Sequence, residues 1–576
     1  AASEKFFQDT GRGGSAPNFR IETKEPFLTA AAFVMILKAD TDSETSCGLC
    51  DGERRVLFVR KLNNPLLPGF YPDPSICRRG EDYYLVTSTF EFFPGVPVFH
   101  SRDLVHWHQI GHCLDRPSQL DLTGFGASQG IYAPTIRCHD GLFYMVTTLV
   151  GGPFYRGNVN FFVTAEDPAG PWSDPVVIEG AEGIDPTLFF DGGKAYYLGN
   201  MRPNPEDRKD KSRHIWLQEL DLGTGKLLGE RHILRTDGAL HHAGTPEGPH
   251  LYHIGEYYYL LIAEGGTGHT HAVTVFRSRT LTGPYEGNPR NPLITHRNLS
   301  FNSPINSTGH ADLIETQNGE WWAVMLGSRP DGGQYRNLGR ETFAVPVIWE
   351  DGWPVSSPET GHVEFSFPAP DLPECRWPEP PACDAFESPE LALCWNFLRT
   401  SREPRYSLSA RPGFLRLYAR PETICEAASP SFLGRRQQHM CFSARTVMEF
   451  FPDSPDDRAG MTAFLNEQYH LRAELCGGML TLYRRSGGTD EILARVPCPA
   501  QRIWLKIETH FQQYGFFYAL QPEEWRELGT ADGTILCKET AGGFTGAYLG
   551  IYASSGGAVS KGYADFDWFE YRPIPE

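Results

Sequence analysis

The chain has 576 residues, more than a single hydrophobic core usually serves, so at least two domains are expected. It carries 71 Asp and Glu against 52 Lys and Arg, a formal charge of −19, and this acidic balance excludes a nucleic-acid partner. Aromatic residues make up 13% of the chain and charged residues only 21%, which excludes a disordered protein. No apolar run reaches the roughly 18 residues that span a bilayer, so no membrane partner is predicted.

Residues 1–60 are predicted to be an N-terminal extension, and no structure can be assigned to them from the sequence. Their apolar stretch, Phe27 to Leu37, follows acidic as well as basic residues and is a poor match to a secretory signal. Cys47 and Cys50 form a single CxxC pair without a second ligand pair nearby, so no metal site is predicted.

Residues 61–365 contain five segments that repeat one pattern. Each has a small or acidic start, a short alternating strand, a turn with Gly, and a second strand rich in aromatic residues. The five starts are Asp73-Pro-Ser-Ile, Ala133-Pro-Thr-Ile, Asp185-Pro-Thr-Leu, Gly248-Pro-His-Leu and Gly309-His-Ala-Asp-Leu. Two strands around a Gly turn indicate a hairpin, and the spacing suits a four-stranded blade. We therefore predict a five-bladed β-propeller over 61–365; a β-sandwich with accidental similarity is the alternative.

The remainder of the chain divides into a linker and a second domain. Residues 366–384 contain six prolines, which predicts a stiff, extended linker. Residues 385–576 again show short alternating segments, such as Phe414 to Tyr418 and Trp504 to Thr509, and are predicted to form a β-sandwich. The fold class expected for the whole protein is all-β.

Acidic residues open several of the propeller units, where the inner strands of different blades converge at one end of the channel. They are Asp73, Asp185 and Glu247, joined by His310 and Asp312. An Asp before Pro often only starts a turn. Two carboxyls, one protonated and one ionised, are however what glycoside hydrolysis needs, and a third carboxylate helps to keep its neighbour protonated. The three carboxyls together predict a catalytic site.

Several stretches of the chain resemble glycoside hydrolase family 43, and within it the two-domain branch of β-xylosidases and α-L-arabinofuranosidases. They include Gly69-Phe-Tyr-Pro-Asp-Pro-Ser-Ile, Ile131-Tyr-Ala-Pro-Thr-Ile, Gly183-Ile-Asp-Pro-Thr-Leu-Phe, Pro246-Glu-Gly-Pro-His-Leu-Tyr and Leu338-Gly-Arg-Glu-Thr-Phe. The resemblance covers residues 61–365 densely. It reaches the C-terminal domain through Ala564-Asp-Phe-Asp-Trp-Phe-Glu-Tyr.

The resemblance implies an inverting mechanism and a role for each residue of the site. Asp73 would be the general base, Glu247 the general acid, and Asp185 the residue that orients the acid and tunes its pKa. The substrate-binding residues would be Arg340, which hydrogen-bonds a sugar hydroxyl, the pocket walls Phe90 and Tyr132, and His310 near the channel centre. No cofactor is required, although some relatives hold a hydrated calcium in the channel, which here would lie near His310.

Tyr132 stands where the xylosidase relatives have Trp, and this difference favours arabinose over xylose as the sugar released. The first expectation is an exo-acting α-L-arabinofuranosidase that removes side chains from plant cell-wall arabinoxylan or its oligosaccharides. The alternatives are a β-D-xylosidase, one enzyme with both activities, and a carbohydrate-binding propeller without catalysis. The Asn298 and Asn306 sequons permit glycosylation in a secreted protein, and an extracellular location is expected.

Overall fold

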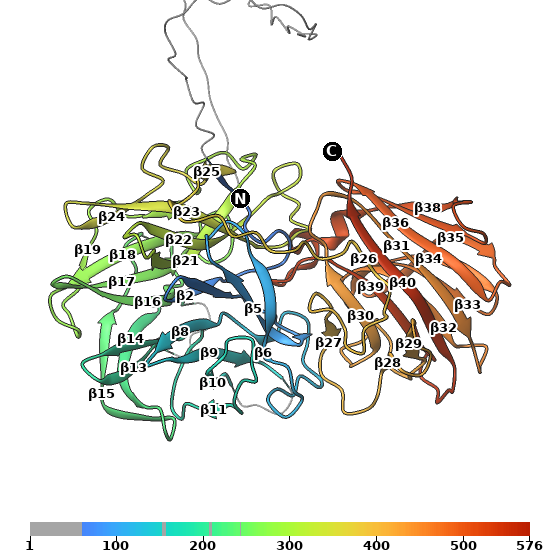
Figure 1. Cartoon of the computed structure of the whole chain (residues 1–576), viewed down its shortest axis with the longest axis horizontal. Helices are drawn as coiled ribbons and strands as arrows, with labels where there is room; N and C mark the ends of the chain where they lie inside the picture. The colour runs from blue at the N-terminus through green and yellow to red at the C-terminus, as the bar shows by residue number, and fades with distance from the viewer. Residues whose placement is uncertain (1–59, 153–156, 205, 207–209, 242, 576) are drawn as a thin grey trace, which may run out of the picture. The chain divides into compact units, whose positions relative to one another are not determined.

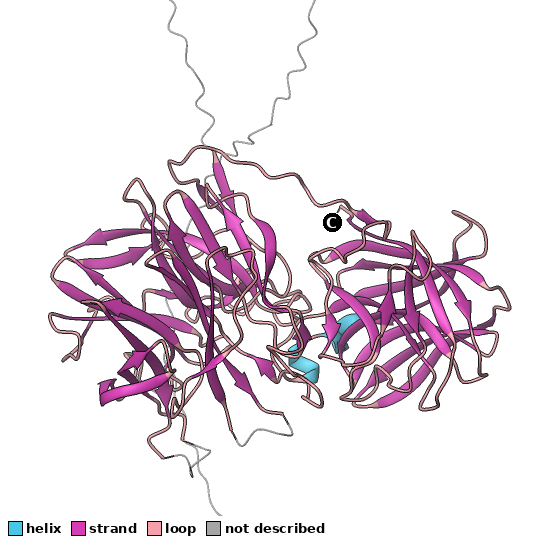
Figure 2. Ribbon diagram, turned by 60° about the horizontal axis from the view of Figure 1, so that its bottom comes forward, coloured by secondary structure: helices cyan, strands magenta, loops and turns pink. Residues whose placement is uncertain are grey.

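The computed structural model of the protein describes residues 60–575 except 153–156, 205, 207–209 and 242. The predicted N-terminal extension and its CxxC pair lie outside the described residues. Strands make up almost all the secondary structure, which confirms the all-β prediction (Figures 1 and 2). In the part that the structure describes, no helix is long and apolar enough to cross a membrane.

Five antiparallel sheets follow one another along the N-terminal part of the described chain (Figure 1). The first contains β2 (Ser75–Arg79), β3 (Asp82–Val86), β5 (Gly95–Ser101) and β6 (His108–Leu114). The second contains β7 (Gly130–Ile131), β8 (Thr135–His139), β9 (Leu142–Val150), β10 (Val159–Ala165) and β11 (Val176–Val177). The third contains β12 (Thr187–Asp191), β13 (Lys194–Met201), β14 (His214–Asp221) and β15 (Lys226–Arg235).

The fourth and fifth sheets repeat this order of strands. The fourth contains β16 (Glu247–Ile254), β17 (Tyr257–Glu264), β18 (Ala272–Ser278), β19 (Glu286–Gly287) and β20 (Ile294–Thr295). The fifth contains β21 (Asn306–Glu315), β22 (Trp321–Ser328), β23 (Glu341–Glu350) and β24 (Trp353–Ser356). Because Asn306 is buried at the start of β21, that sequon is inaccessible in the folded protein, whereas Asn298 is exposed.

Each predicted repeat unit forms a hairpin in one of these sheets. The pairs are β2 with β3, β8 with β9, β12 with β13, β16 with β17 and β21 with β22. The first strands of neighbouring units contact one another from β2 through β8 and β12 to β16, and β21 contacts both β2 and β17. Contacts of this kind close a ring of sheets, which is the arrangement of the predicted propeller.

Asp312, on β21, joins several sheets at the ring's centre. Its side chain is fully buried and accepts hydrogen bonds from the Ser75 hydroxyl at 2.7 Å and from the Tyr252 hydroxyl at 2.5 Å. Arg137 donates to it at 2.8 Å. Burial alone would raise the pKa of Asp312, but the Arg137 guanidinium and these hydrogen bonds hold it far below its usual range. Asp312 is therefore ionised, its charge is balanced by Arg137, and its hydrogen bonds hold the sheets of the propeller together.

The segment predicted as a linker carries short strands at both ends. At its start β25 (Ser366–Pro368) pairs with β1 (Lys61–Asn63), the first described strand. At its end β26 (Cys383–Asp384) pairs with β40 of the C-terminal domain. The prolines between them lie in irregular backbone.

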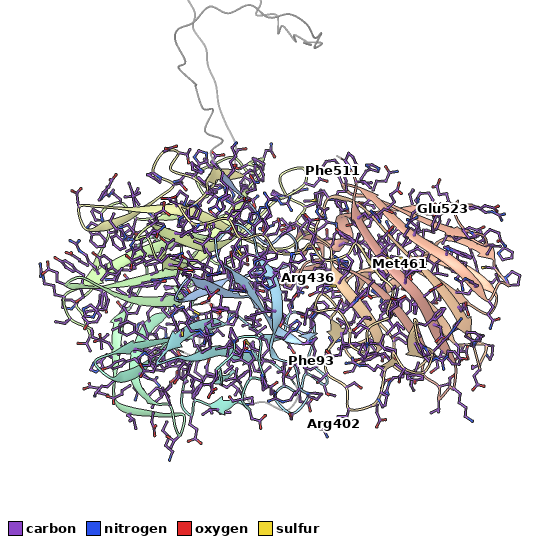
Figure 3. The ribbon with its side chains drawn as sticks, viewed as in Figure 1. Phe93, Arg402, Arg436, Met461, Phe511 and Glu523 are labelled. Carbon is purple, nitrogen blue, oxygen red and sulfur yellow. The ribbon has the colours of Figure 1, made fainter. Side chains whose placement is uncertain are left out.

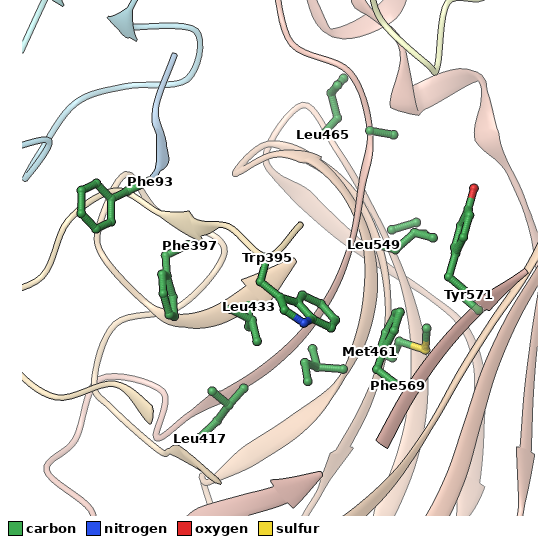
Figure 4. Close-up of a cluster of buried hydrophobic side chains, with 14 of the residues drawn as sticks. Phe93, Trp395, Phe397, Leu417, Leu433, Met461, Leu465, Leu549, Phe569 and Tyr571 are labelled. Carbon is green, nitrogen blue, oxygen red and sulfur yellow. The ribbon is translucent and has the colours of Figure 1, made fainter. Parts of the chain in front are cut away.

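The C-terminal domain consists of two sheets that face one another across an apolar core. One sheet contains β28 (Tyr406–Ser407), β29 (Leu415–Tyr418), β40 (Tyr563–Pro573), β31 (Cys441–Phe451), β36 (Arg502–His510), β37 (Gln513–Ala519) and β38 (Arg526–Asp532), with β26 at its side. The other contains β30 (Ser431–Arg436), β39 (Tyr548–Ser554), β32 (Arg458–Asn466), β33 (Tyr469–Cys476), β34 (Met479–Ser486) and β35 (Thr489–Pro497). Side chains from both sheets, such as Met461 and Phe569, share one buried cluster, so the domain is the predicted sandwich (Figure 4).

Propeller and sandwich are joined by backbone pairing and by buried arginines. The propeller strand β4 (Phe92–Phe93) pairs with β27 (Phe397–Leu398), and Figure 4 shows Phe93 near Phe397. Arg436, labelled in Figure 3, is buried and donates to the Phe70 carbonyl at 2.6 Å. Arg399 is fully buried and donates to the Phe125 carbonyl and to the Glu467 carboxylate. These contacts hold loops of the sandwich against the channel end that carries the predicted site.

Candidate active site

Four of the five repeat units place a left-handed residue at the equivalent position. They are Asp73 (φ 56°), Asp185 (φ 54°), Gly248 (φ 56°) and His310 (φ 50°). This conformation is costly for a residue with a side chain, and such strain is concentrated at functional sites. Glu247 directly precedes Gly248 at the start of β16, where the pairing with β17 shifts register. The predicted carboxyl residues thus share one structural position, with Glu247 displaced by one residue.

Asp73 is held as an anion by its neighbours. Its carboxyl group is buried, accepts a hydrogen bond from the Ser88 hydroxyl at 2.6 Å and forms an ion pair with Arg340. The Nδ1 atom of His310 lies 3.9 Å from Asp73 Oδ1. Burial alone would raise the pKa of Asp73, but Arg340, His310 and the Ser88 hydrogen bond together lower it below its usual value. Asp73 is therefore ionised over the ordinary pH range.

Asp185 and Glu247 are shifted in the opposite direction. Burial and the carboxylate of Asp73 raise the pKa of Glu247 to about 7, against the opposing charges of Arg213 and Arg340. Burial and the carboxylates of Glu247 and Asp73 raise the pKa of Asp185 well above its usual value. Like charges in a buried site resist simultaneous ionisation, so this cluster keeps a proton near neutral pH. One ionised and one protonated carboxyl group are thus available together.

Arg340 lies between the acidic cluster and an aromatic wall. Its guanidinium carbon is 5.7 Å from the centre of the Phe90 ring, and its Nε atom has no hydrogen-bond partner among the described residues. The Phe90 and Tyr132 rings are 4.9 Å apart. A buried donor without a partner is costly, and a sugar hydroxyl would satisfy it. The structure therefore brings the predicted residues Phe90, Tyr132 and Arg340 to the carboxyl groups.

The sandwich supplies one wall of the site, which the sequence did not reveal. Phe544 lies 6.0 Å from Phe90, with the two rings nearly parallel, and 6.1 Å from Tyr132. Its backbone N–H donates to the Ser128 hydroxyl of the propeller at 2.8 Å. No local pattern in the chain marks Phe544, because only the junction of the domains brings it to the site.

His310 is buried between the Asp73 carboxylate and the ring of His250. Burial lowers the pKa of His310, so its ring is neutral at pH 7. A Cβ at Gly248 would lie 3.0 Å from His310 Cε1, and Gly248 also needs its positive φ, so only glycine fits there. The ring of His310 also lies near that of His250, with the two ring centres 6.4 Å apart.

The side chains near His310 do not supply a set of oxygen ligands for calcium, so the hydrated calcium that the resemblance implies would take its oxygen ligands from water. Calcium takes six or more oxygen ligands. The nearby carboxylates are engaged, since Asp73 pairs with Arg340 and Asp312 pairs with Arg137. Within residues 60–575, apart from the short gaps, no group of three His, Cys, Asp or Glu could hold a metal ion.

Buried carboxyl groups held in opposite protonation states, beside aromatic rings and an unsatisfied arginine, define the active site of a glycoside hydrolase. The family models agree with this class. "Glycosyl hydrolases family 43" matches residues 62–354, and "Beta xylosidase C-terminal Concanavalin A-like domain" matches residues 383–572. The chain belongs to glycoside hydrolase family 43 and has the two-domain form predicted from the sequence.

Known relatives cover nearly the whole described chain. A xylosidase/arabinosidase of Butyrivibrio fibrisolvens is 46% identical over 89% of this chain and 99% of its own length. A non-reducing end alpha-L-arabinofuranosidase of Bacteroides ovatus is 41% identical over 90% of this chain and 96% of its own. The solved structure of a xylan beta-1,4-xylosidase from Bacillus halodurans is 37% identical, with a TM-score of 0.83 over 89% of this chain and all of that one.

Proposed function

We propose that the enzyme is an exo-acting, inverting α-L-arabinofuranosidase that releases terminal arabinofuranosyl side chains from plant cell-wall arabinoxylan or its oligosaccharides. The observation that carries the chemistry is the opposite pKa shift of Asp73 and Glu247 within one cluster. Ionised Asp73 takes a proton from the attacking water while Glu247 protonates the departing oxygen. Arg340 Nε donates to a sugar hydroxyl, and Phe90, Tyr132 and Phe544 enclose the ring.

A β-D-xylosidase, alone or combined with the first activity, is the second candidate. It is supported by the relatives named as xylosidases, whereas Tyr132 in place of Trp supports the arabinofuranosidase. Membership in an enzyme family leaves no support for the non-catalytic propeller.

An extracellular location is a further proposal, which cell fractionation of the source organism would test.

Product analysis decides between the two activities. The enzyme is incubated with arabinoxylan and, separately, with unsubstituted xylo-oligosaccharides. Arabinose from the first and no xylose from the second is the expected result. Xylose alone would replace the first candidate by the second, and both sugars would indicate a bifunctional enzyme. Proton NMR of the first product formed should show the inverted anomer, because water attacks from the face opposite the leaving group.

Asp185→Asn should move the alkaline limb of the pH profile of kcat/KM toward acid. The pair Asp185–Glu247 resists losing its last proton because both groups would then be charged. Without the second carboxyl, Glu247 ionises more easily, its pKa falls, and the protonated acid is lost at lower pH. Substantial residual activity is expected because Asp73 and Glu247 remain. If the variant kept high activity and its alkaline limb did not move, Asp185 would not tune the pKa of Glu247. If activity were lost at every pH, Asp185 would itself be the base.

Phe544→Ala should lower kcat/KM about 2- to 10-fold, because the sugar loses an aromatic wall worth about 0.5–1.5 kcal/mol. Phe511→Ala is the matched control, since Phe511 belongs to the same domain and is exposed (Figure 3). Kinetics on an aryl arabinofuranoside and a thermal melt of each variant provide the measurement. If both variants retained full kcat/KM, the sandwich would not contribute to the site.

A further inference from the structure

A pocket adjoins the candidate active site at the end of the β13–β14 hairpin. Its volume is about 400 Å³, within the usual range for small-ligand sites. Gly183 and Ile184, which directly precede Asp185, form one side of it, and Arg202 and Arg213 line the other. Asn200 fixes these two sides together by donating to the Ile184 carbonyl at 3.0 Å. The pocket therefore lies next to Asp185, because the residues that precede Asp185 form part of its lining.

Two arginines stand opposite one another in this pocket. The pairing of β13 with β14 ends at Met201 opposite His214, so Arg202 and Arg213 occupy the next cross-strand position. Like charges at such positions repel and destabilise a hairpin. Burial and the charge of neighbouring Arg202 lower the pKa of Arg213, against the opposing charges of Glu247 and Asp210. A counter-anion between the two guanidinium groups would relieve it.

Neither arginine forms an ion pair with a carboxylate among the described residues. Arg202 Nη1 is buried and has no hydrogen-bond partner in the part of the chain that the structure describes. Within the described residues, Arg213 Nη1 donates to the backbone carbonyls of Asp210, at 3.3 Å, and Ser212, at 2.6 Å. This is notable in a chain with a formal charge of −19.

Glu182 and Asp210, two carboxylates beside the pocket, have other partners, and Glu247 of the acidic cluster attracts Arg213 from the active-site side. Glu182, which also lines it, pairs with Arg231 at 2.9 Å. The Asp210 carboxylate attracts both arginines but accepts hydrogen bonds from the Ser212 backbone N–H and hydroxyl at 2.8 and 2.7 Å. A planar guanidinium with free N–H groups is the preferred partner of a carboxylate. The pocket thus offers a site for an anion of small-sugar size.

We propose that Arg202 and Arg213 form a subsite for a carboxylate-bearing sugar, a uronosyl unit, on the leaving-group side of the scissile bond. This side is assigned because the pocket residues Gly183 and Ile184 directly precede Asp185, which would orient the acid Glu247, and because the charge of Arg213 acts on Glu247. The inference rests on the proposed function for the identity of the chain being cut. It adds a preference for substrates in which the leaving group, the part of the chain that remains after the terminal sugar is released, carries a uronosyl substituent.

Binding is measured by isothermal titration of the full chain carrying Asp73→Asn, which slows turnover about 10²–10⁴-fold. The probes are xylotriose and xylotriose with a glucuronosyl substituent. The acidic sugar should bind about tenfold more tightly at low ionic strength, as expected for one or two charge-assisted hydrogen bonds. Added salt should reduce this preference, since it screens the charges.

Arg202→Gln and Arg213→Gln should each abolish most of the preference. Arg279→Gln is the control, because Arg279 is an exposed arginine directly after β18 that pairs with Glu256. Equal or weaker binding of the acidic sugar, or a preference that survives both pocket substitutions, would overturn the proposal. If a pocket variant failed to fold, the salt dependence of the parent protein would decide.

Failure of the proposed function can be distinguished from failure of the proposed subsite. Hydrolysis of neutral oligosaccharides by the protein with Asp73 intact tests the function alone. Activity without a preference for the acidic sugar refutes only the subsite. Tight binding of the acidic sugar without hydrolysis of any arabinoside or xyloside refutes only the function.

Discussion

Replacing Asp73 by Asn is expected to lower kcat by about 10²–10⁴-fold, the usual contribution of general base catalysis. Asn keeps the volume and an acceptor for Arg340 but cannot take a proton from water. Asp73→Ala would be a poorer test, because it leaves the buried Arg340 guanidinium without its counter-charge, and an uncompensated buried charge is strongly destabilising.

The measurement is kcat on an arabinofuranosyl oligosaccharide, with a thermal melt to show that Asp73→Asn is folded. Asp82→Asn is the matched control, because Asp82 lies on β3 of the same sheet and pairs with His100 away from the cluster. Turnover near that of the unsubstituted enzyme would end the assignment of Asp73 as the base. In the unsubstituted enzyme, activity should fall at acid pH only below the usual pKa of Asp, because the pKa of Asp73 is lowered.

The propeller hairpins could be predicted because their signals are local. Each unit carries its strand, Gly turn and aromatic strand within a short stretch, and the structure pairs those two strands in all five units. The equivalence of Asp73 and Asp185 followed from the same alignment. Their left-handed backbone did not, because the residue before a Pro is usually extended.

Contacts between distant segments could be predicted only for residues at equivalent repeat positions. Asp312 appeared to belong to the acidic ring by spacing alone, but its charge is compensated by Arg137 from another sheet. Phe544 reaches the site only through the junction between propeller and sandwich. The same limit applies to Arg202 and Arg213, whose proximity depends on the register of β13 with β14. Composition and periodicity contain no information about such registers.

Replacing Glu247 by Ala should produce a loss that depends on the leaving group. A sugar alkoxide is a poor leaving group and needs a proton in the transition state, so natural oligosaccharides should lose about 10²–10⁴-fold in kcat/KM. A nitrophenolate departs without protonation, and the corresponding aryl glycoside should lose far less. Glu256→Ala is the matched control, since Glu256 is an exposed residue in the turn between β16 and β17 that pairs with Arg279.

The pH profile provides the second readout for Glu247. In the unsubstituted enzyme kcat/KM on a natural oligosaccharide should decline as the pH rises through about 7, where burial and Asp73 place the pKa of Glu247 and the acid loses its proton. In Glu247→Ala that alkaline limb should disappear, because the titrating acid has been removed, while the acid limb that belongs to Asp73 stays. Equal losses on natural and aryl glycosides, with the alkaline limb intact, would show that Glu247 supports the structure of the site and that another group protonates the leaving oxygen.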